Sequence, residues 1–287
     1  MLNLNTNVKL GSYLAGLIEG DGTVFVPVTF RNKKGRINYA YISICFTIKD
    51  LKLAEKLQSM FGGNLKFNKS NTYVIWIIYK IDLLVILINV IGPFFRTYKL
   101  NKLNSLINYL NINFNHLLKN VKLNNFEMDS SNIQTNAWLS GFADANGNFN
   151  ILISSLKKVN KKRISISFRL ELKKDESYFS ICNKLSSFFG VSLYVRERKQ
   201  KDNIFYAYLI VAHSMKSHVI VCNYFDNFPL YSSKYLNYLD WKKIYLLQIE
   251  QKHLTKEGFD LCINIKNTLN NKRAHFNWDH LDNFYAF

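Results

Sequence analysis

The sequence has few of the residues that break, bend or cross-link a chain. Its 287 residues include three prolines, 12 glycines and four cysteines. Because Cys45, Cys182, Cys222 and Cys262 are far apart and mostly flanked by apolar residues, we expect reduced core residues, neither zinc ligands nor disulfides. Serine or cysteine nucleophile motifs and a glycine-rich phosphate loop are also missing. Their absence argues against the enzyme classes that these motifs mark.

Long apolar runs are missing as well. The most apolar stretch, residues 83–91, is far shorter than the roughly 20 residues that a membrane span requires. The first 12 residues have neither the apolar core of a signal peptide nor the arginine-rich pattern of a transit peptide. We therefore expect no membrane span and no targeting segment.

The composition also bears on the origin of the gene. Asn, Lys, Ile, Phe and Tyr are abundant, whereas Ala, Gly and Pro are scarce, and the favoured residues have A/T-rich codons. This bias favours an organellar genome and a mitochondrial protein that is made in the organelle. A bacterium or phage of similar base composition is the alternative.

Acidic residues are scarce relative to basic ones. Twenty Asp and Glu stand against 38 Lys and Arg, which gives a net charge of +18 and a pI of about 9.6. Such an excess indicates a polyanionic partner, nucleic acid first and an anionic membrane surface second. Because no basic amphipathic helix stands out, we expect no membrane partner. The hydrophobic fraction of 48% excludes disorder for most of the chain. The length suits one large domain or two of roughly 100–150 residues.

The chain contains an internal repeat, in which residues 13–22 recur as residues 138–147. Shorter matches follow in the same order: residues 42–46 with 164–168, Leu57, Phe61 and Gly62 with Leu185, Phe189 and Gly190, and Pro93 and Leu100 with Pro229 and Leu236. Since two of the three prolines are equivalent, chance is a poor explanation. The repeat divides the chain into a first half (1–110), a polar linker (111–135) and a second half (136–287).

Each half predicts the same order of elements, αββαββα, and therefore the α+β fold class. A short apolar helix runs into a turn that contains acidic residues and glycine. Strands of alternating polarity follow, at residues 23–31 and 38–49 in the first half and 148–154 and 164–173 in the second. The tail after Gln251 has no counterpart in the first half, and we expect it to pack against the second.

Residues 14–22, Leu-Ala-Gly-Leu-Ile-Glu-Gly-Asp-Gly, resemble the signature of the LAGLIDADG homing endonucleases, and residues 139–147 form a second copy. The resemblance covers nearly the whole chain. It implies a monomer with two pseudo-twofold halves, whose motif helices pack together through small residues such as Gly16 and Gly141. It also implies that two antiparallel sheets form a saddle over a long, asymmetric double-stranded DNA target.

The resemblance implies a metal site at the end of each motif helix. In the family, the eighth motif position is the metal-binding carboxylate, which is Asp21 in the first copy and corresponds to Asn146 in the second. The carbonyls of Gly20 and Ala145 would complete the shell of Mg²⁺ or another divalent cation, since hard oxygen ligands suit this ion.

Two further pairs of residues follow from the same alignment of motifs. Glu19 and Asp144 occupy the sixth motif position, which is usually not a metal ligand in the family. Lys99 and Lys234 flank the proline-containing junctions, which resemble the family's central-lysine region. We expect them to act near the scissile phosphate.

Basic turns recur at the same place in both halves, beside alternating polar strand positions. Lys and Arg neutralise phosphates there, while Asn, Thr and Arg on an exposed strand face reach base edges. We therefore expect the following residues to bind DNA: Thr23, Thr29, Arg31, Lys33, Arg36, Lys66, Asn68, Lys69, Asn148, Asn150, Ser154, Lys158, Arg163, Arg196, Arg198 and Lys201.

Asn146 departs from the family pattern, because a neutral amide offers a metal an oxygen but no charge. The expected activity is hydrolysis of phosphodiesters in a specific double-stranded DNA, with cleavage impaired or limited to nicking. An engineered change that traps an uncleaved complex, a natural nickase or slow nuclease, and a natural loss of cleavage are the alternatives. In the last case the protein would be a DNA-binding protein or a maturase that assists the folding of its own intron RNA.

Overall fold

The computed structural model describes residues 8–118, 122–156, 161–200 and 203–285. They group into two compact units. The first unit comprises the described residues up to Ala145 together with residues 281–285, and the second comprises Asn146–His280. The helix of the second motif thus belongs to the first unit except for its last residue, Asn146.

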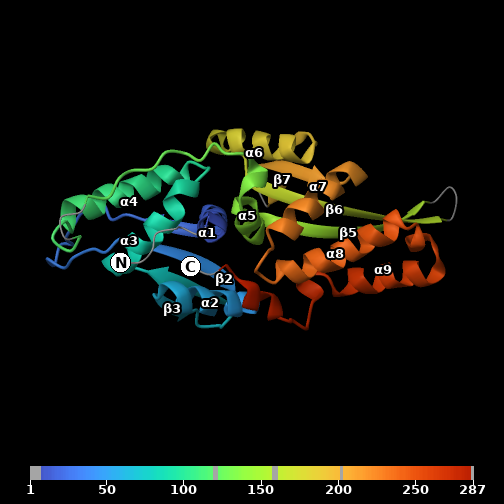
Figure 1. The fold of residues 1–287 in the computed structure, drawn as a ribbon, viewed down its shortest axis with the longest axis horizontal. Coiled ribbons are helices and arrows are strands. Elements are labelled where there is room, and N and C mark those ends of the chain that lie inside the picture. Colours follow the sequence, from blue (N-terminus) through green and yellow to red (C-terminus); the bar gives the residue numbers. More distant parts are fainter. Residues whose placement is uncertain (1–7, 119–121, 157–160, 201–202, 286–287) are drawn as a thin grey trace. The chain divides into compact units, whose positions relative to one another are not determined.

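The first unit is built on one antiparallel sheet (Figure 1). Its strand order is β1-β2-β4-β3. Its elements are α1 (Val8–Asp21), β1 (Gly22–Phe25), β2 (Tyr41–Thr47), α2 (Leu51–Phe61), β3 (Asn64–Phe67), β4 (Tyr73–Ile78), α3 (Ile81–Ile91), α4 (Lys99–Asn113) and α5 (Trp138–Asn146).

Alternating side chains give this sheet one apolar and one polar face. In β2, Ile42, Ile44 and Phe46 are buried, whereas Cys45 and Thr47 between and beyond them are exposed. Because successive side chains of a strand point to opposite faces, one face forms the core with α1, α2 and α4, which contact the strands. The other face is open, and this is the face on which the sequence predicts DNA contacts.

The second unit repeats this architecture, with the strand order β5-β6-β8-β7. Its elements are β5 (Gly147–Leu156), β6 (Lys161–Lys173), α6 (Glu176–Phe189), β7 (Leu193–Gln200), β8 (Asn203–Ala212), α7 (Met215–Asn227), α8 (Lys234–Ile249) and α9 (Lys256–Thr268). The predicted α+β class is confirmed. Each half follows the order αββαββα, and one more helix, α4 or α8, comes after the proline.

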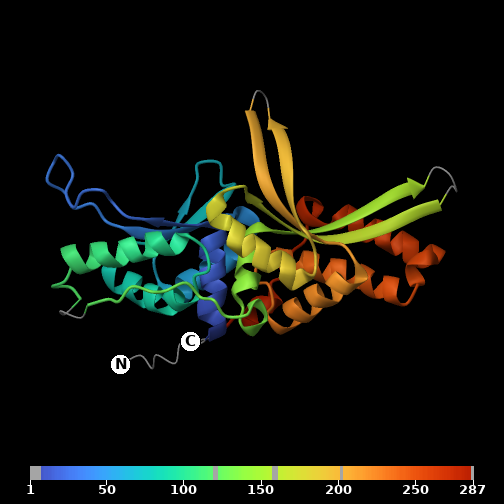
Figure 2. The ribbon, with the colours of Figure 1, turned by 90° about the horizontal axis from the view of Figure 1, so that it is seen from above.

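Aromatic rings form the core of the second unit. Phe149 of β5 lies 5.0 Å from Phe168, 5.8 Å from Phe225 and 5.8 Å from Trp241, measured between ring centroids. These side chains are buried, and aromatic pairs at such distances stabilise a core beyond the burial of their area. The β7–β8 hairpin extends away from helices α7–α9 (Figure 2). Residues 197–199 and 203–206 near its tip are exposed.

The predicted strand over residues 23–31 is too long, because β1 ends at Phe25. Pro27 lacks an amide hydrogen and cannot continue the ladder. Residues 26–40 are irregular apart from one bridge between Arg31 and Ile37. Val28, which the alternating pattern placed on a strand face, is fully exposed.

The predicted match between residues 42–46 and 164–168 is wrong by four residues. Gly22 of the first motif pairs with Ile44, whereas the equivalent Gly147 pairs with Leu170. The β5–β6 hairpin of the second unit is longer than the β1–β2 hairpin. The similar Ile-Ser-Ile sequences therefore lie at different positions in the strand register. Leu170, and not Ile166, is the structural counterpart of Ile44.

The C-terminal tail does not pack against the second half alone. Asn270, just after α9, donates a hydrogen bond to the Phe149 carbonyl oxygen at 2.9 Å within the second unit. Phe284, however, packs edge-on against Tyr13 of α1, with 5.7 Å between ring centroids. Residues 281–285 therefore belong to the first unit.

No helix in the described part of the chain is long and apolar enough to cross a membrane.

Helices α1 and α5 of the first unit meet through two glycines. A Cβ atom added to Gly16 would overlap the Trp138 carbonyl and lie 2.8 Å from the Phe142 nitrogen. One added to Gly141 would overlap the Tyr13 carbonyl and lie 2.7 Å from the Leu17 nitrogen. Since backbone atoms cannot rotate away as side chains do, glycine is required at both positions.

This contact predicts a large loss of stability for Gly16→Ala and Gly141→Ala. Overpacking of this kind costs about 3 kcal/mol, measured as the free energy of unfolding in urea. Gly190→Ala is the matched control. A Cβ there meets no atom within 4 Å, and only the positive φ of 63° opposes it, at about 1 kcal/mol. Equal losses for Gly16→Ala and Gly190→Ala would contradict the proposed backbone contact.

Candidate functional site

The C-terminus of α1 presents an exposed carboxylate. Asp21 is the last residue of the helix and is exposed, Gly20 is half-buried, and Gly22 begins β1. The chain turns here directly from helix to strand. A Cβ at Gly22 would lie 2.7 Å from the Ile18 Cα and carbonyl oxygen, so only glycine permits the turn that places Asp21 at this edge.

The side chain of Lys99 stabilises this turn through hydrogen bonds. Lys99 is the first residue of α4 and donates hydrogen bonds through Nζ to the carbonyl oxygens of Ile18 at 3.1 Å and Gly22 at 2.7 Å. Burial lowers the pKa of the Lys99 ammonium, while the negative charges of Glu19 and Asp21 oppose this shift. A cation at the C-terminus of a helix also interacts favourably with the helix dipole.

Glu19, two residues before Asp21, has a different environment. It is fully buried, and its carboxylate accepts hydrogen bonds from the Arg96 amide at 2.9 and 3.0 Å and from the Thr97 amide and hydroxyl at 2.6 Å. Trp138 Nε1 of α5 donates a further bond at 2.6 Å. Burial raises the pKa of Glu19, and these hydrogen bonds act in the opposite direction. Glu19 therefore connects three parts of the chain: helix α1, the segment that precedes α4, and helix α5.

Asp144, at the same motif position in the second copy, is buried as well. It accepts a hydrogen bond from the Tyr13 hydroxyl at 2.8 Å. Both carboxylates at the sixth position thus lie inside the protein and accept hydrogen bonds from its own groups.

The remaining residues of the expected site belong to the second unit or to the boundary. Ala145 and Asn146 end α5 and are half-buried, and Lys234 is the first residue of α8. Asn146 and Lys234 are part of the second unit, whereas Asp21, Gly20 and Lys99 are part of the first. The structure therefore brings together Asp21 and Lys99 within one unit.

The prediction that Cys45 is a core residue is wrong. Cys182, Cys222 and Cys262 are buried free thiols as expected, but Cys45 is exposed on the open face of β2. Partial burial and the negative charge of Asp21 raise the pKa of its thiol. The alternation of Ile42, Ile44 and Phe46 carried the signal, because it leaves Cys45 on the opposite face of the strand.

The donors near Asp21 suit a hard divalent cation that keeps most of its water. Within the described residues, no group of three or more His, Cys, Asp or Glu side chains could hold a metal ion. Magnesium does not require such a cage, because it usually binds through one or two carboxylates together with waters and substrate phosphates. The exposed carboxylate of Asp21 beside the Gly20 carbonyl fits this mode, and a zinc-type site does not fit.

Comparison with known proteins agrees with this geometry. The LAGLIDADG endonuclease family matches residues 14–113 and 139–245. The chain belongs to this family. The intron-encoded DNA endonuclease aI3 of Saccharomyces cerevisiae is 33% identical over 99% of the chain and 75% of its own length. An uncharacterised cox1 intron-2 protein of Schizosaccharomyces pombe is 32% identical over 87% of the chain and 69% of its own length.

Solved structures of LAGLIDADG homing endonucleases share the fold. I-SmaMI bound to cleaved DNA has a TM-score of 0.68 at 20% identity, over 92% of this chain and 97% of that one. I-LtrWI bound to target DNA has a TM-score of 0.65 at 21% identity, over 92% and 99% of the two chains. At these identities the likeness concerns the fold of the two chains.

Most of the expected DNA-binding residues of this LAGLIDADG protein lie on the open faces of the sheets or in their turns. Thr23 and Lys66 are exposed on β1 and β3, and Asn148 is exposed on β5, where Ser154 pairs with the exposed Arg163 of β6. Those in turns are also exposed: Thr29, Arg31, Lys33, Arg36 and Lys69. Asn150 is half-buried on β5, and Lys158 and Lys201 lie outside the described residues.

Asn68 has a local role that its sequence position did not indicate. Its Oδ1 accepts hydrogen bonds from the amides of Thr72 at 2.8 Å and Tyr73 at 3.1 Å. Its Nδ2 donates to the hydroxyls of Ser70 and Thr72 at 2.7 and 2.9 Å. The amide therefore closes the β3–β4 turn, as Asn side chains often do.

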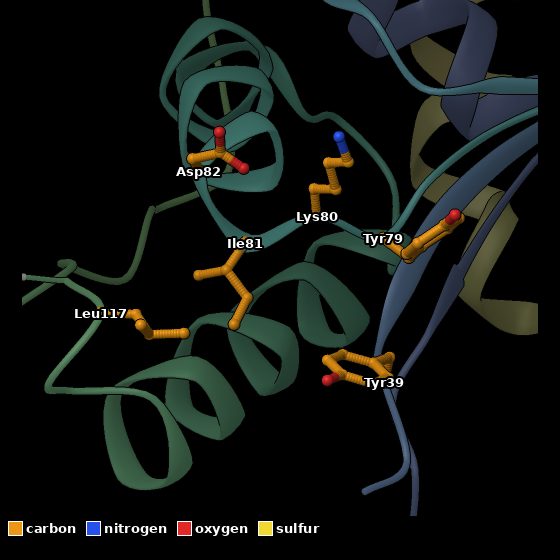
Figure 3. Close-up of a pocket in the computed structure, with 6 residues that line it drawn as sticks. All are labelled: Tyr39, Tyr79, Lys80, Ile81, Asp82 and Leu117. Carbon is orange, nitrogen blue, oxygen red and sulfur yellow. The ribbon is translucent and has the colours of Figure 1, made fainter.

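A groove of about 510 Å³ opens at the end of the first sheet (Figure 3). Its lining residues are Tyr39, Tyr79, Lys80, Ile81, Asp82 and Leu117. This set contains no cysteine, serine or histidine, the side chains that most often act as nucleophiles or general bases. The groove is therefore a poor candidate for a catalytic site.

The contrast between Glu19 and Asp21 predicts opposite effects of two similar substitutions. Glu19→Gln places an amide NH₂ against N–H donors and leaves buried groups unsatisfied, which should lower the free energy of unfolding by about 1–3 kcal/mol. Asp21→Asn changes an exposed group and should alter stability by less than about 0.5 kcal/mol. Urea unfolding followed by tryptophan fluorescence measures both. A stable Glu19→Gln variant would contradict the structural role of Glu19.

Proposed function

We propose that the protein is a site-specific endonuclease of double-stranded DNA, which binds its target with the open faces of both sheets and cleaves it with a divalent metal. Family membership supports the reaction class. The single observation that carries the proposal is the distribution of charge over the fold. Two relatives, at 33% and 32% identity, are named as an intron-encoded DNA endonuclease and an uncharacterised intron protein.

The positive charge is concentrated in the sheets. The segments that contain their strands and turns, residues 22–47, 64–80, 147–174 and 191–213, hold 19 of the 38 Lys and Arg residues but three of the 20 acidic residues. The rest of the chain, mainly helices and linker, is nearly neutral. A polyanion therefore favours the sheets over the helices, and alternating polar positions on a strand suit the major groove of DNA.

Asp21 would hold the metal in the first unit, with the Gly20 carbonyl as a further ligand. When bound, a divalent cation neutralises charge on the phosphate and makes a water more acidic. Asp21 is exposed and can meet both the ion and the DNA backbone. Lys99 has three N–H donors, and two of them bind carbonyl oxygens. The third would reach a phosphate oxygen while the other two keep the Asp21 turn in place.

Asn146 would weaken the second metal position. Its amide oxygen replaces a charged ligand, and the Ala145 carbonyl and the Lys234 ammonium add no negative charge. We therefore infer slower cleavage of one strand, so that nicked DNA accumulates.

We also propose that the protein acts as a monomer and in mitochondria, since its relatives are named as fungal intron-encoded proteins and its composition favours an organellar genome.

Restoring the carboxylate should restore double-strand cleavage. On a supercoiled plasmid with the target and Mg²⁺, Asn146→Asp should raise the rate of linear product by roughly tenfold or more, because metal charge stabilisation is worth several kcal/mol. Asp21→Asn should abolish the cleavage that remains. Asn132→Asp, an exposed linker position, is the charge-matched control. No gain of linear product with Asn146→Asp would disprove the assigned role of Asn146.

A second candidate function is assistance to RNA splicing. The intron-encoded RNA maturase bI4 of Saccharomyces cerevisiae is 27% identical over 71% of the chain, although the chain spans 30% of that protein. A maturase would use the basic sheets for its own intron RNA and would not require Asp21.

Splicing of the host intron in vitro separates the two functions. If the protein is a maturase, Asp21→Asn should promote splicing within about twofold of the unchanged protein, because an exposed carboxylate adds little to RNA affinity. If the protein is an endonuclease alone, neither form accelerates splicing, and Asp21→Asn loses cleavage. No acceleration of splicing by the unchanged protein would contradict the maturase proposal.

A further inference from the structure

One carboxylate lies among arginines on the open face of the second sheet. Glu171 of β6 forms ion pairs with Arg196 and Arg198 of β7, at 3.2 and 2.7 Å between nitrogen and oxygen. Arg169, two residues earlier on β6, lies 3.9 Å away. We call these four residues the Glu171 cluster. The cluster is on the face that carries Asn148, because Asn148 pairs with Arg169 in the sheet.

The guanidinium groups of the cluster are accessible, although their carboxylate is largely covered. The side chain of Glu171 is 23% exposed, whereas those of Arg196 and Arg198 are 41% and 53% exposed. A molecule that approaches the open face therefore meets the arginines before it meets Glu171. The carboxylate acts on such a molecule mainly through the positions of the two guanidinium groups.

A carboxylate on a surface that binds phosphates lowers affinity unless it has a compensating role. Here it leaves the cluster with a net charge of +2. Each guanidinium has five N–H donors in a rigid plane. Glu171 accepts hydrogen bonds from Nη1 of Arg196 and Nη2 of Arg198, which leaves further N–H donors on each guanidinium for another partner. Two parallel N–H donors in this arrangement match the O6 and N7 acceptors of guanine in the major groove.

The cluster is a feature of the second half alone. The register that aligns Ile44 with Leu170 places Cys45 at the position of Glu171. The first sheet therefore has a thiol at this point, and an arginine there would have no carboxylate beneath it. This difference is consistent with a target whose two halves are read differently.

We propose that Glu171 is a positioning residue that orients Arg196 and Arg198 for direct readout of guanine bases. This inference rests on the proposed function as a sequence-specific DNA-binding endonuclease. Glu171 does not contact the DNA. It restricts two long side chains to one orientation, and this restriction converts a general attraction for phosphates into a preference for particular base pairs.

The test is a binding selection from a library of random duplex DNA, with Ca²⁺ as the metal. Ca²⁺ is chosen because I-SmaMI has been observed on uncleaved target in the presence of calcium ions. The unchanged protein should enrich guanine at two or three neighbouring positions of one half-site. Glu171→Gln should reduce discrimination at those positions by about tenfold, because an oriented arginine–guanine pair is worth ~1–3 kcal/mol. It should retain binding to duplexes of unrelated sequence.

Three further variants separate positioning from charge. Arg196→Lys and Arg198→Lys keep the charge but lose the planar fork, and they should lose preference at the same positions. Glu197→Gln changes the net charge as Glu171→Gln does, but Glu197 lies on the opposite face of β7, since its neighbour Arg196 is in the cluster. It should leave the selected sequence unchanged.

The outcomes distinguish the inference from the function on which it rests. An identical selected sequence for Glu171→Gln and the unchanged protein would overturn the positioning role and leave the proposed function intact. Loss of preference by Glu197→Gln as well would attribute the effect to charge and also overturn it. If the unchanged protein enriches no sequence, both proposals fail. Circular dichroism checks each fold, and Glu171→Asp, which keeps the charge on a shorter side chain, should lose preference at the same positions if Glu171→Gln does not fold.

Discussion

The rest of the first unit depends on the backbone contact between α1 and α5 at Gly16 and Gly141. Because the two helices meet without side chains between them, residues one turn further along each helix are also enclosed. Glu19 and Asp144 are therefore buried and must be satisfied by protein donors, and Trp138 and Tyr13 of the facing helices supply some of these bonds. Asp21 lies beyond the contact and is exposed at the surface.

Two carboxylates separated by one glycine thus have different roles because of burial alone. Glu19 receives hydrogen bonds from three residues and holds segments together, whereas Asp21 is presented at a turn that Lys99 stabilises. The same principle applies to the polar faces of the sheets. Asn68 closes a turn and Glu171 binds arginines, although both have the residue type that a groove-reading surface uses.

Much of the fold could be predicted from sequence because both halves carry the same local signals. The order αββαββα and the glycine contact between the motif helices follow from the motif and the periodicity of the strands. The strand over residues 23–31 failed because Pro27 removes a ladder donor. The match of residues 42–46 with 164–168 was wrong because a repeated tripeptide does not determine the register in which two strands pair. The same strand register places Cys45 and Glu171 at equivalent positions of the two sheets.

The sequence by itself determined the family, the duplication, the excess of positive charge in the strand segments and the amide at position 146. These properties are local, and residue types at fixed spacings are sufficient to define them. The tertiary structure alone decided which carboxylates are buried, which carbonyl oxygens Lys99 binds and which arginines surround Glu171. Residues far apart in the chain make these contacts, and their partners are set by strand register and helix packing, which periodicity cannot specify.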